Sequence, residues 1–496
     1  MKYYLGIDLG SSSIKIALVE SDTGKNVGVV QEPEQEMSMY AFKKGWAEQK
    51  PEDWWNYACK GIAKIKKIHN ISKNDISGIG ISYQMHGLVI VDVNGKPLRK
   101  SIIWCDSRAV EIGNTAYQQI GSDFCDKHLL NSPANFTASK LKWVKENEPD
   151  VFDNIFKFML PGDYIAYRFS DIINTTVSGL SEGVFWDFKE DDVSSSVLNY
   201  FGIQQSLVPE IVDTFSQQGT VSAKGAEQCG LLEGTPILYR AGDQPNNALS
   251  LNVFHPGEVA ATGGTSGVVY AITDNLSVKE SSKVNNFAHV NYKKSGTKNI
   301  GKLLCINGAG IQYRWLLNNL SVSSYEEMNQ LASEVAVGSD GVCLIPFGNG
   351  AERMLSNKDV GTSIVNLNLN RHSTAHLCRA ALEGIAFSFV YGIEIMKSDG
   401  IEAKVIRAGN DNLFRSEIFA NTISTLIGQE IEIYNTTGAI GAARACALKD
   451  GNFDTFSSFM KNDHVMTYIP LKDKTGYEIA YQNWKKELKR ILNKNN

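Results

Sequence analysis

The sequence predicts an α/β protein built from two related domains, and three observations support that prediction. The chain has 496 residues, which is too long for one hydrophobic core and favours two or three domains. Short apolar runs of strand length alternate with stretches of helical periodicity. A strand–turn–strand unit with a turn rich in Gly, Ser and Thr occurs near residue 10 and again near residue 265. We therefore expect two α/β domains that meet near residue 250.

The composition is that of an ordinary soluble globular protein, with 43% hydrophobic and 21% charged residues. The net charge of -5 is small for this size, so charge indicates neither nucleic acid nor a membrane as partner. No apolar run approaches the roughly 18–20 residues of a membrane helix, and the first residues do not resemble a signal peptide. The eight cysteines form no Cys-x-x-Cys pair, so we expect reduced thiols and a cytoplasmic location.

In the first half, apolar runs between turn residues predict a series of strands. These strands are expected at residues 3–7, 14–19, 27–30, 79–81 and 88–93. A helix should begin at Pro51, a residue type that is favoured at the first helical position. Trp54, Ala58 and Ile62 follow with helical spacing. Asn94-Gly95 should turn the last strand into a hairpin.

The second half repeats this pattern. Strands are expected at residues 237–239, 258–261, 268–272 and 405–409. Helices are expected from about residue 246, over 372–396 with Ser373 as cap, from residue 438, and over 484–492 near the C-terminus. We accordingly divide the chain into residues 1–247, 248–450 and a helical tail at 451–496.

The two Gly/Ser/Thr turns are candidate phosphate sites, because glycine lets the backbone approach an anion and aim N–H groups at it. The first turn comprises Gly10, Ser11, Ser12 and Ser13, with Asp8 before it and Lys15 after it. Asp8 stands at a strand end and could hold Mg²⁺, usually through water. The second turn contains Gly264, Thr265 and Gly267. The first turn alone is equally compatible with a hairpin that binds nothing, and neither turn has Walker-loop spacing. Together they favour a nucleotide held in a cleft between the domains.

Three further segments place polar groups after strands. Asp243 follows the strand at 237–239 and is either a general base in a cleft or a cap for the next helix. Gln84, Met85 and His86 suit hydrogen bonding to a polyhydroxylated ligand, although a lone histidine is more often a core residue. Trp104 and Asp106 combine an aromatic ring with a charge, and are alternatively an ordinary strand end.

These motifs, in this order, resemble the FGGY family of carbohydrate kinases, and within it the xylulokinases. The resemblance runs from Tyr3 to about Leu448. It is carried by the segments 6–15, 84–87, 104–108, 137–144, 161–164, 242–244, 264–267, 308–312 and 376–383. The sequence departs from the family pattern at Asn135, at Val365, at Gln244 after Asp243, and at 408–410 beside the adenine site.

The resemblance implies a two-domain actin-like (ribonuclease H-like) ATPase fold with ATP and sugar in the interdomain cleft. It implies that Asp243 is the catalytic base and that Asp8 orders Mg²⁺. Gln84, Met85, His86, Trp104, Asp106 and Gln244 would bind the sugar. Gly10 to Ser13, Lys15, Gly264, Thr265 and Gly267 would bind phosphate, and Gly308, Gln312, Gly409 and Asn412 would border the adenosine.

The reaction implied is transfer of the γ-phosphate of ATP to a ketopentose, first of all D-xylulose. Ribulose, gluconate and glycerol remain alternative substrates in the same family. An actin-like ATPase without a sugar substrate is the remote alternative, and the segment 84–87 argues against it. Partners are expected to be small molecules, with neither nucleic acid nor membrane, and a homodimer is possible within the family.

Overall fold

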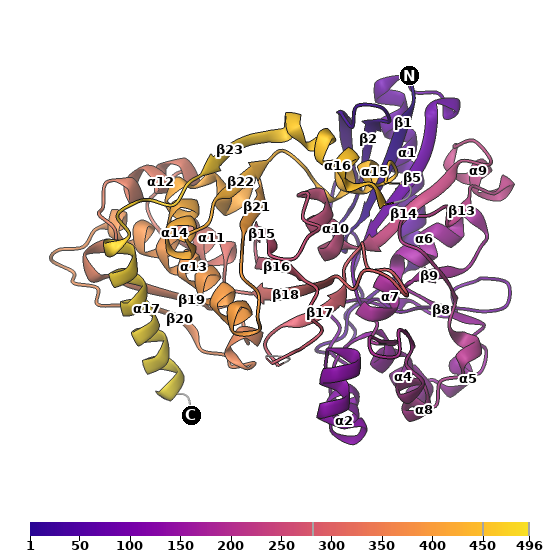
Figure 1. Ribbon diagram of the computed structural model, residues 1–496, viewed down its shortest axis with the longest axis horizontal. Helices are drawn as coiled ribbons and strands as arrows, with labels where there is room; N and C mark the ends of the chain where they lie inside the picture. Colours follow the sequence, from indigo (N-terminus) through magenta and orange to yellow (C-terminus); the bar gives the residue numbers. More distant parts are fainter. Residues whose placement is uncertain (280–281, 449–450, 495–496) are drawn as a thin grey trace.

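The computed structural model describes residues 1–279, 282–448 and 451–494, which form two α/β domains side by side (Figure 1). The first domain is built on a six-stranded sheet of order β13-β14-β5-β1-β2-β3. Its strands are β1 (Tyr3–Leu9), β2 (Ile14–Glu20), β3 (Asn26–Glu32), β5 (Ile76–Tyr83), β13 (Gly219–Thr220) and β14 (Pro236–Gly242).

The second domain is built on a seven-stranded sheet of order β17-β18-β16-β15-β21-β22-β23. Its strands are β15 (Glu258–Gly263), β16 (Gly267–Thr273), β17 (Asn285–Ala288), β18 (Ile300–Ile306), β21 (Val405–Gly409), β22 (Ile431–Tyr434) and β23 (His464–Tyr468). The principal helices are α1 (Pro51–His69), α6 (Pro161–Ser170), α7 (Val177–Glu182), α10 (Asp243–Ser250), α11 (Gly310–Asn319), α12 (Tyr325–Ser333), α13 (Thr374–Ser398), α14 (Glu417–Ile427), α15 (Gly438–Ala445), α16 (Phe453–Met460) and α17 (Thr475–Lys494).

The two sheets share one topology. In the first, β1 pairs antiparallel with β2 and β2 with β3, whereas β5 joins β1 and β14 joins β5 in parallel. In the second, β15, β16 and β18 form the antiparallel part and β21 and β22 the parallel part. The two halves are therefore structural repeats, which confirms the fold class that the paired hairpins predicted.

Strand β2 shows why the first sheet is covered on both faces. Ile14, Ile16 and Leu18 point into the core under α1, whereas Ala17 and Val19 face α15. The alternation follows from the two-residue period of a strand. Small residues on the second face allow a helix to lie unusually close to the sheet.

That helix comes from the far end of the chain. Helix α15 follows β22 of the second sheet but packs against β1 and β5 of the first. A Cβ added to Gly6 would stand 1.9 Å from the carbonyl oxygen of Ala439, and one added to Gly80 would stand 1.9 Å from that of Ala442. In return α10, which ends the first domain, packs against α15 and reaches β15 and β16. The domains are thus joined by two exchanged helices.

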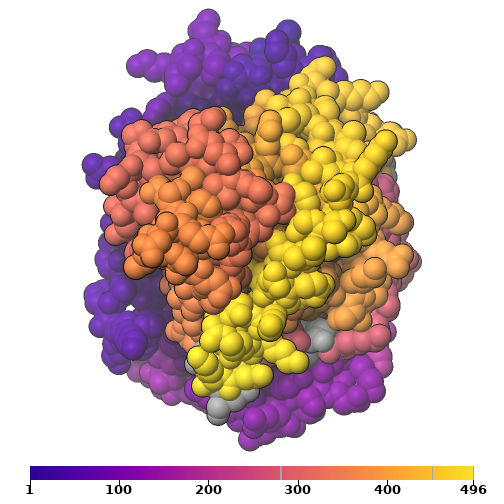
Figure 2. Space-filling model, turned by 90° about the vertical axis from the view of Figure 1, so that its left-hand side faces the viewer, coloured from indigo at the N-terminus to yellow at the C-terminus, as the bar shows by residue number. Residues whose placement is uncertain are grey.

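The C-terminal segment corrects one prediction. Residues after 450 do not form a separate tail, because β23 completes the second sheet and α17 lies along the surface of the second domain (Figure 2). Trp484 of α17 is buried and donates from Nε1 to the carbonyl oxygen of Leu344 at 3.0 Å. The boundary drawn between residues 247 and 248 falls inside α10. Residues 449–450 and 495–496 of the predicted ranges lie outside the described residues.

Most predicted elements lie where the sequence placed them. Helix α1 begins at Pro51, α13 follows Ser373, and β21 spans Val405–Gly409. Several elements differ in extent, and helix α17, for example, begins at Thr475 rather than near residue 484. The strand expected at 88–93 is only β6 (Val89–Val91), because the chain already turns at Asp92, whose N–H donates to Lys96 O at 3.0 Å. Helix α10 begins at Asp243, three residues early.

Candidate active site

The first hairpin places a carboxylate at the end of β1. Asp8 accepts a hydrogen bond from Ser82 Oγ of β5 at 2.9 Å, and it lies opposite Lys15 in the antiparallel pair β1–β2. Burial raises the pKa of Asp8, and the Ser82 hydrogen bond and the Lys15 charge oppose that rise. A Cβ on Gly438 would stand 2.9 Å from Asp8 Oδ2, so the carboxylate lies against the N-terminus of α15. A side chain at position 438 would push against this carboxylate.

The turn between β1 and β2 is held in place by hydrogen bonds from neighbouring segments. Gly10 N donates to Ser13 O at 3.0 Å and closes the hairpin. The carbonyl oxygen of Ser11 accepts Gln49 Nε2 at 2.6 Å, and that of Ser12 accepts the N–H of Met37 at 2.8 Å. Because these carbonyls point back into the protein, the turn has a fixed shape before any ligand arrives. The side chains of Ser12 and Lys15 are exposed.

Asp243 stands where β14 ends and α10 begins. It is the first residue of the helix, and Gly242 rather than Asp243 occupies the cap position. Burial raises the pKa of Asp243 to about 7, and the neighbouring charge of Asp8 adds to the rise, whereas the N–H groups of the first helical turn and Gln244 oppose it. A carboxylate with a pKa near neutrality is suited to accept a proton.

Helix α10 connects the two hairpins. Asn246 Nδ2 donates to the carbonyl oxygen of Gly438 at 2.9 Å, which ties α10 to α15 beside Asp8. One residue further, Asn247 Nδ2 donates to Thr262 Oγ1 of β15 at 3.0 Å, close to the second hairpin. Asp243 therefore lies on an element that is anchored on both sides of the cleft.

The predicted sugar-binding segment lies beside Asp243. The side chain of Met85 lies against Gly242, since a Cβ on that glycine would stand 2.6 Å from Met85 Cγ. Gln84 is buried and donates from Nε2 to Gln49 Oε1 at 3.2 Å, while its own Oε1 has no partner within the protein. His86 is half-buried, with a positive φ of 61°. An amide oxygen and an imidazole are thus available beside the base.

The imidazole of His86 is neutral. Burial lowers the pKa of His86 to about 3, and the positive charge of Lys140 lowers it further. The His86 ring packs against Phe136 at 4.7 Å and against Phe287 of β17 at 5.2 Å between ring centroids. Because Phe287 belongs to the second domain, the segment lies on the interdomain boundary.

Trp104 and Asp106 have different positions from each other. Trp104 is 51% exposed, and its Nε1 lies 3.4 Å from Ser11 Oγ, so it stands over the first hairpin. Asp106 is 0% exposed and already accepts hydrogen bonds from the N–H of Ala47 at 2.5 Å and from Arg108. The expectation that Asp106 binds substrate directly is therefore corrected: its carboxylate holds Arg108 and the neighbouring loops in place.

A cavity of about 740 Å³ opens at the second hairpin. Its lining includes three residues that the sequence assigned to nucleotide binding, Gly264, Thr265 and Asn412. Most of the other lining residues come from α11, α12 and the start of α14: Gly310, Tyr313, Arg314, Tyr325, Glu326, Asn329, Gln330, Ser333, Ser416, Glu417 and Ile418. Gly263, Leu413 and Arg415 complete the lining. The cavity has the size of a small-molecule site.

In the second domain, four other residues that were predicted to bind the nucleotide do not line this cavity. Gly308 lies where a Cβ would stand 1.9 Å from the carbonyl oxygen of Pro346, and its N–H donates to Glu352 at 2.9 Å, so it serves close packing. Gln312 accepts Thr362 Oγ1 at 2.7 Å. Gly267 packs on Phe389, and Gly409 ends β21 beside Asp411. Sequence reasoning missed Tyr313 and Arg314, which lie one helical turn beyond Gly310.

The site offers carboxylate oxygens to a magnesium ion but no preformed set of protein ligands. Within residues 1–279, 282–448 and 451–494, no three His, Cys, Asp or Glu side chains gather as a metal site. Mg²⁺ commonly binds through one or two carboxylates, water and substrate phosphates. Asp8 fits that mode, because its carboxylate lies beside the turn that is predicted to bind phosphate.

Among the described residues, no helix combines the length and hydrophobicity that a bilayer crossing requires. All eight cysteines are free thiols, as expected.

The fold and the site together define a two-domain sugar-kinase architecture, and comparison with known proteins assigns the family. The chain matches the N-terminal domain of the FGGY family of carbohydrate kinases over residues 3–250 and its C-terminal domain over residues 259–449. It belongs to this family.

Individual relatives agree with that assignment. The chain is 29% identical to the xylulose kinase of Bacillus subtilis over 92% of this chain and 90% of the relative. It is 27% identical to that of Haemophilus influenzae over 98% and 100%. Among solved structures, a xylulose kinase from Rhodospirillum rubrum (23% identity, 99% of both chains) and a Plasmodium falciparum glycerol kinase with ADP (21% identity, 99% and 98%) each superpose with a TM-score of 0.88. At these identities the structural likeness shows the fold.

Proposed function

We propose that this carbohydrate kinase transfers the γ-phosphate of ATP to the primary hydroxyl of a ketopentose, D-xylulose, on carbon five. The observation that carries the proposal is the half-buried carboxylate Asp243, with a pKa of about 7, which follows Gly242 against Met85 and is influenced by the charge of Asp8 in the first hairpin. The names of the relatives favour xylulose among the possible sugars.

In this proposal Asp243 accepts the proton of the attacking hydroxyl. Gln84, Met85, His86, Trp104 and Gln244 position the sugar. Aligning two substrates in this way lowers a barrier by roughly 7–11 kcal/mol. Phosphoryl transfer needs such alignment and charge neutralisation more than covalent help from the protein.

The nucleotide would lie between the hairpins, with its phosphates at Ser11, Ser12, Ser13, Lys15, Gly264 and Thr265. The adenosine would occupy the 740 Å³ cavity, bordered by Asn412. Asp8 would hold Mg²⁺, directly or through water, and the ion would neutralise phosphate charge. A cytosolic location and a homodimer are further parts of this proposal.

A second substrate class has one observation in its favour. Gln244 follows the base, as is common in the glycerol kinases that the sequence also resembles. Glycerol, gluconate and ribulose therefore belong in the test beside D-xylulose.

The test is a sugar panel under one ATP concentration, followed by a coupled assay for ADP, with phosphorus and carbon NMR to locate the phosphate. We expect the highest kcat/KM with D-xylulose and phosphate on carbon five. A ranking of D-xylulose among the poorest substrates would refute the proposed specificity. ATP hydrolysis that ignores every sugar would refute the kinase itself.

A further inference from the structure

Glu182 is a buried acid that lies directly under the catalytic segment. It is the last residue of α7 and is 1% exposed. Its Oε2 would stand 2.6 Å from a Cβ placed on Gly242, the residue immediately before Asp243. The carboxyl group therefore touches the backbone that presents the base.

The main chain of Glu182 contacts the sugar-binding segment. His86 Nδ1 lies 2.9 Å from the carbonyl oxygen of Glu182. A carbonyl can only accept, so Nδ1 carries the proton of the neutral imidazole. Nε2 is consequently left as an acceptor, able to receive a hydrogen bond from a sugar hydroxyl. Glu182 thus contacts the imidazole through its carbonyl oxygen and the backbone before the base through its carboxyl group.

Helix α7 is a firm support for these two contacts. Ser178 Oγ donates to Ala288 O at 3.0 Å, and the N–H of Ala288 donates to Ser181 Oγ at 3.0 Å. Ala288 belongs to β17, the edge strand of the second sheet. Because α7 is hydrogen-bonded across the domain boundary, the position of Glu182 is fixed by both domains.

The charged and titratable groups around Glu182 come from several elements. They are Tyr83, His86, Lys140, Asp163, Asp243 and Tyr270. Arg240, the nearby cation, is paired with Asp163 at 2.9 Å. Burial raises the pKa of Glu182 well above its usual value, and the charge of Asp243 raises it further. Both effects favour the protonated, neutral form of the Glu182 carboxyl group.

We propose that Glu182 is a positioning residue that fixes the positions of His86 and Asp243 relative to each other. The sugar hydroxyl that His86 helps to bind is thereby held within reach of the base. This inference rests on the proposed function, in which Asp243 is the base. It adds a residue that contacts neither substrate and acts through two that do.

The experiment compares Glu182→Gln with Glu182→Leu. Glutamine keeps the shape and hydrogen-bonding capacity of a neutral carboxyl group, and leucine keeps only the volume. We expect E182Q to retain most of the wild-type kcat. E182L should lose about 10²-fold in kcat, the scale of a misplacement near 1 Å. It should also bind the sugar more weakly, by KM and by calorimetry, while KM for ATP stays unchanged.

Matched controls are Glu383→Gln and Glu383→Leu. Glu383 is equally buried, but it lies on α13 and pairs with Arg379 and the N–H of Gly338, away from the cleft. These variants report what loss of a buried acid does to folding, measured by thermal unfolding, and should leave the sugar KM unchanged.

Three results would overturn the proposal: E182L with wild-type kcat and sugar affinity, E182Q as impaired as E182L, or an ATP KM that rises together with that of the sugar. The variant Asp243→Asn distinguishes a failure of the positioning role of Glu182 from a failure of the function proposed above. If D243N keeps full turnover, the base assignment fails, whereas the effect of Glu182 on His86 is still read from sugar binding by calorimetry.

Discussion

Two carboxyl groups lie on either side of Gly242: that of Asp243, which is half-buried, and that of Glu182, which is buried. Asp243 has N–H groups of α10 and Gln244 to stabilise its charge, and its pKa reaches about 7. Burial raises the pKa of Glu182 as well, and the charge of Asp243 adds to that rise. Environments that separate the pKa values of two acids assign one as base and leave the other neutral. The residue scale therefore yields predictions about pH.

The first prediction concerns the pH dependence of catalysis. A general base must be ionised, so kcat/KM should fall as the pH drops below about 7, the pKa of Asp243 in the free enzyme. Asp243→Ala should lower kcat by about 10²–10⁴-fold and abolish this acid limb. Steady-state rates between pH 5 and pH 9, buffered at constant ionic strength, check both. Near-normal turnover of folded D243A would contradict the assignment.

The second prediction concerns stability. The pKa of Asp243 is higher in the folded chain than its ordinary value of 3.8, so its contribution is fully favourable below that value and is lost as the pH rises through about 7. Asp243→Asn cannot ionise. It should therefore raise the melting temperature, and by more at pH 8 than at pH 5. Equal gains at both pH values, in thermal unfolding monitored by circular dichroism, would show that the carboxylate carries no such cost.

At the scale of elements, the exchanged helices decide how the site is assembled. Helix α15 brings Gly438 against Asp8, and its backbone fills the spaces above Gly6 and Gly80. Because backbone atoms cannot turn aside as side chains can, these glycines are sterically required. The contact that holds Asp8 in place is thus made by residues more than 400 positions away in the sequence.

The third prediction follows from this contact. Gly80→Ala places a methyl group 1.9 Å from the Ala442 carbonyl oxygen and should destabilise the protein by about 1–3 kcal/mol through overpacking. It should also lower kcat, because α15 moves away from Asp8. Gly476→Ala is the control: it lies in the first turn of α17, where the new Cβ meets only Val337 at 3.6 Å. Chemical denaturation of both variants measures the difference, and equal stabilities would contradict the steric argument.

The sequence predicted local structure better than it predicted long-range contacts. The strand at 405–409 and the cap at Ser373 follow from local spacing and were placed correctly. The packing of α15 on β1 could not be predicted, since periodicity does not say which sheet a helix covers. Gly308 lies against the backbone of Pro346, and because close packing and ligand contact both select glycine, the sequence does not separate the two. The roles given to Asp8 and Asp243 stay predictions until they are tested.

Glu182 was missed for a related reason. Its neighbours from Val177 to Phe188 are almost all buried. The two acids in this run, Glu182 and Asp187, are the signal that was available, since a buried carboxyl group is costly and uncommon. Only the structure shows that it touches Gly242 and His86.

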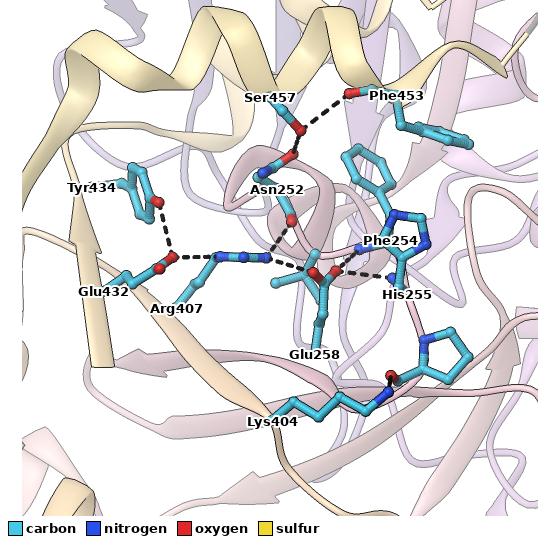
Figure 3. Close-up of polar contacts among 12 residues, drawn as sticks. Asn252, Phe254, His255, Glu258, Lys404, Arg407, Glu432, Tyr434, Phe453 and Ser457 are labelled. Carbon is cyan, nitrogen blue, oxygen red and sulfur yellow. Dashed lines mark hydrogen bonds and ion pairs between the residues drawn. The ribbon is translucent and has the colours of Figure 1, made fainter. Parts of the chain in front are cut away.

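At the scale of the whole molecule, the connection between the domains is a polar cluster. Arg407 of β21 donates to the carbonyl oxygen of Asn252 at 2.6 Å and pairs with Glu258 at 3.0 Å and with Glu432 at 2.7 Å (Figure 3). Glu258 in turn accepts the N–H groups of Phe254 and His255. The cluster therefore fixes the chain that leaves α10 onto the second sheet.

The fourth prediction tests this cluster. Arg407→Met leaves two largely buried carboxylates without their cation and should cost about 3 kcal/mol. Lys404→Met is the neighbouring control, since Lys404 makes only an exposed contact with the carbonyl oxygen of Pro256 at 3.0 Å. Calorimetric unfolding should show a lower transition for R407M and none of that loss for K404M. Equal transitions would mean that the connector is held by its apolar neighbours alone.

The exchange of α15 also has a consequence for biosynthesis. The first sheet is synthesised early, but the helix that covers its β1–β5 face is made only after residue 437. Until then the small apolar side chains of that face, Ala17 and Val19 among them, stay open to water and to chaperones. A nascent chain can therefore form the strands that carry Asp8 and still lack the helix that seats it. The surroundings of Asp8 become complete only after α15 has been made, so fragments that end before it are expected to be inactive and prone to aggregate.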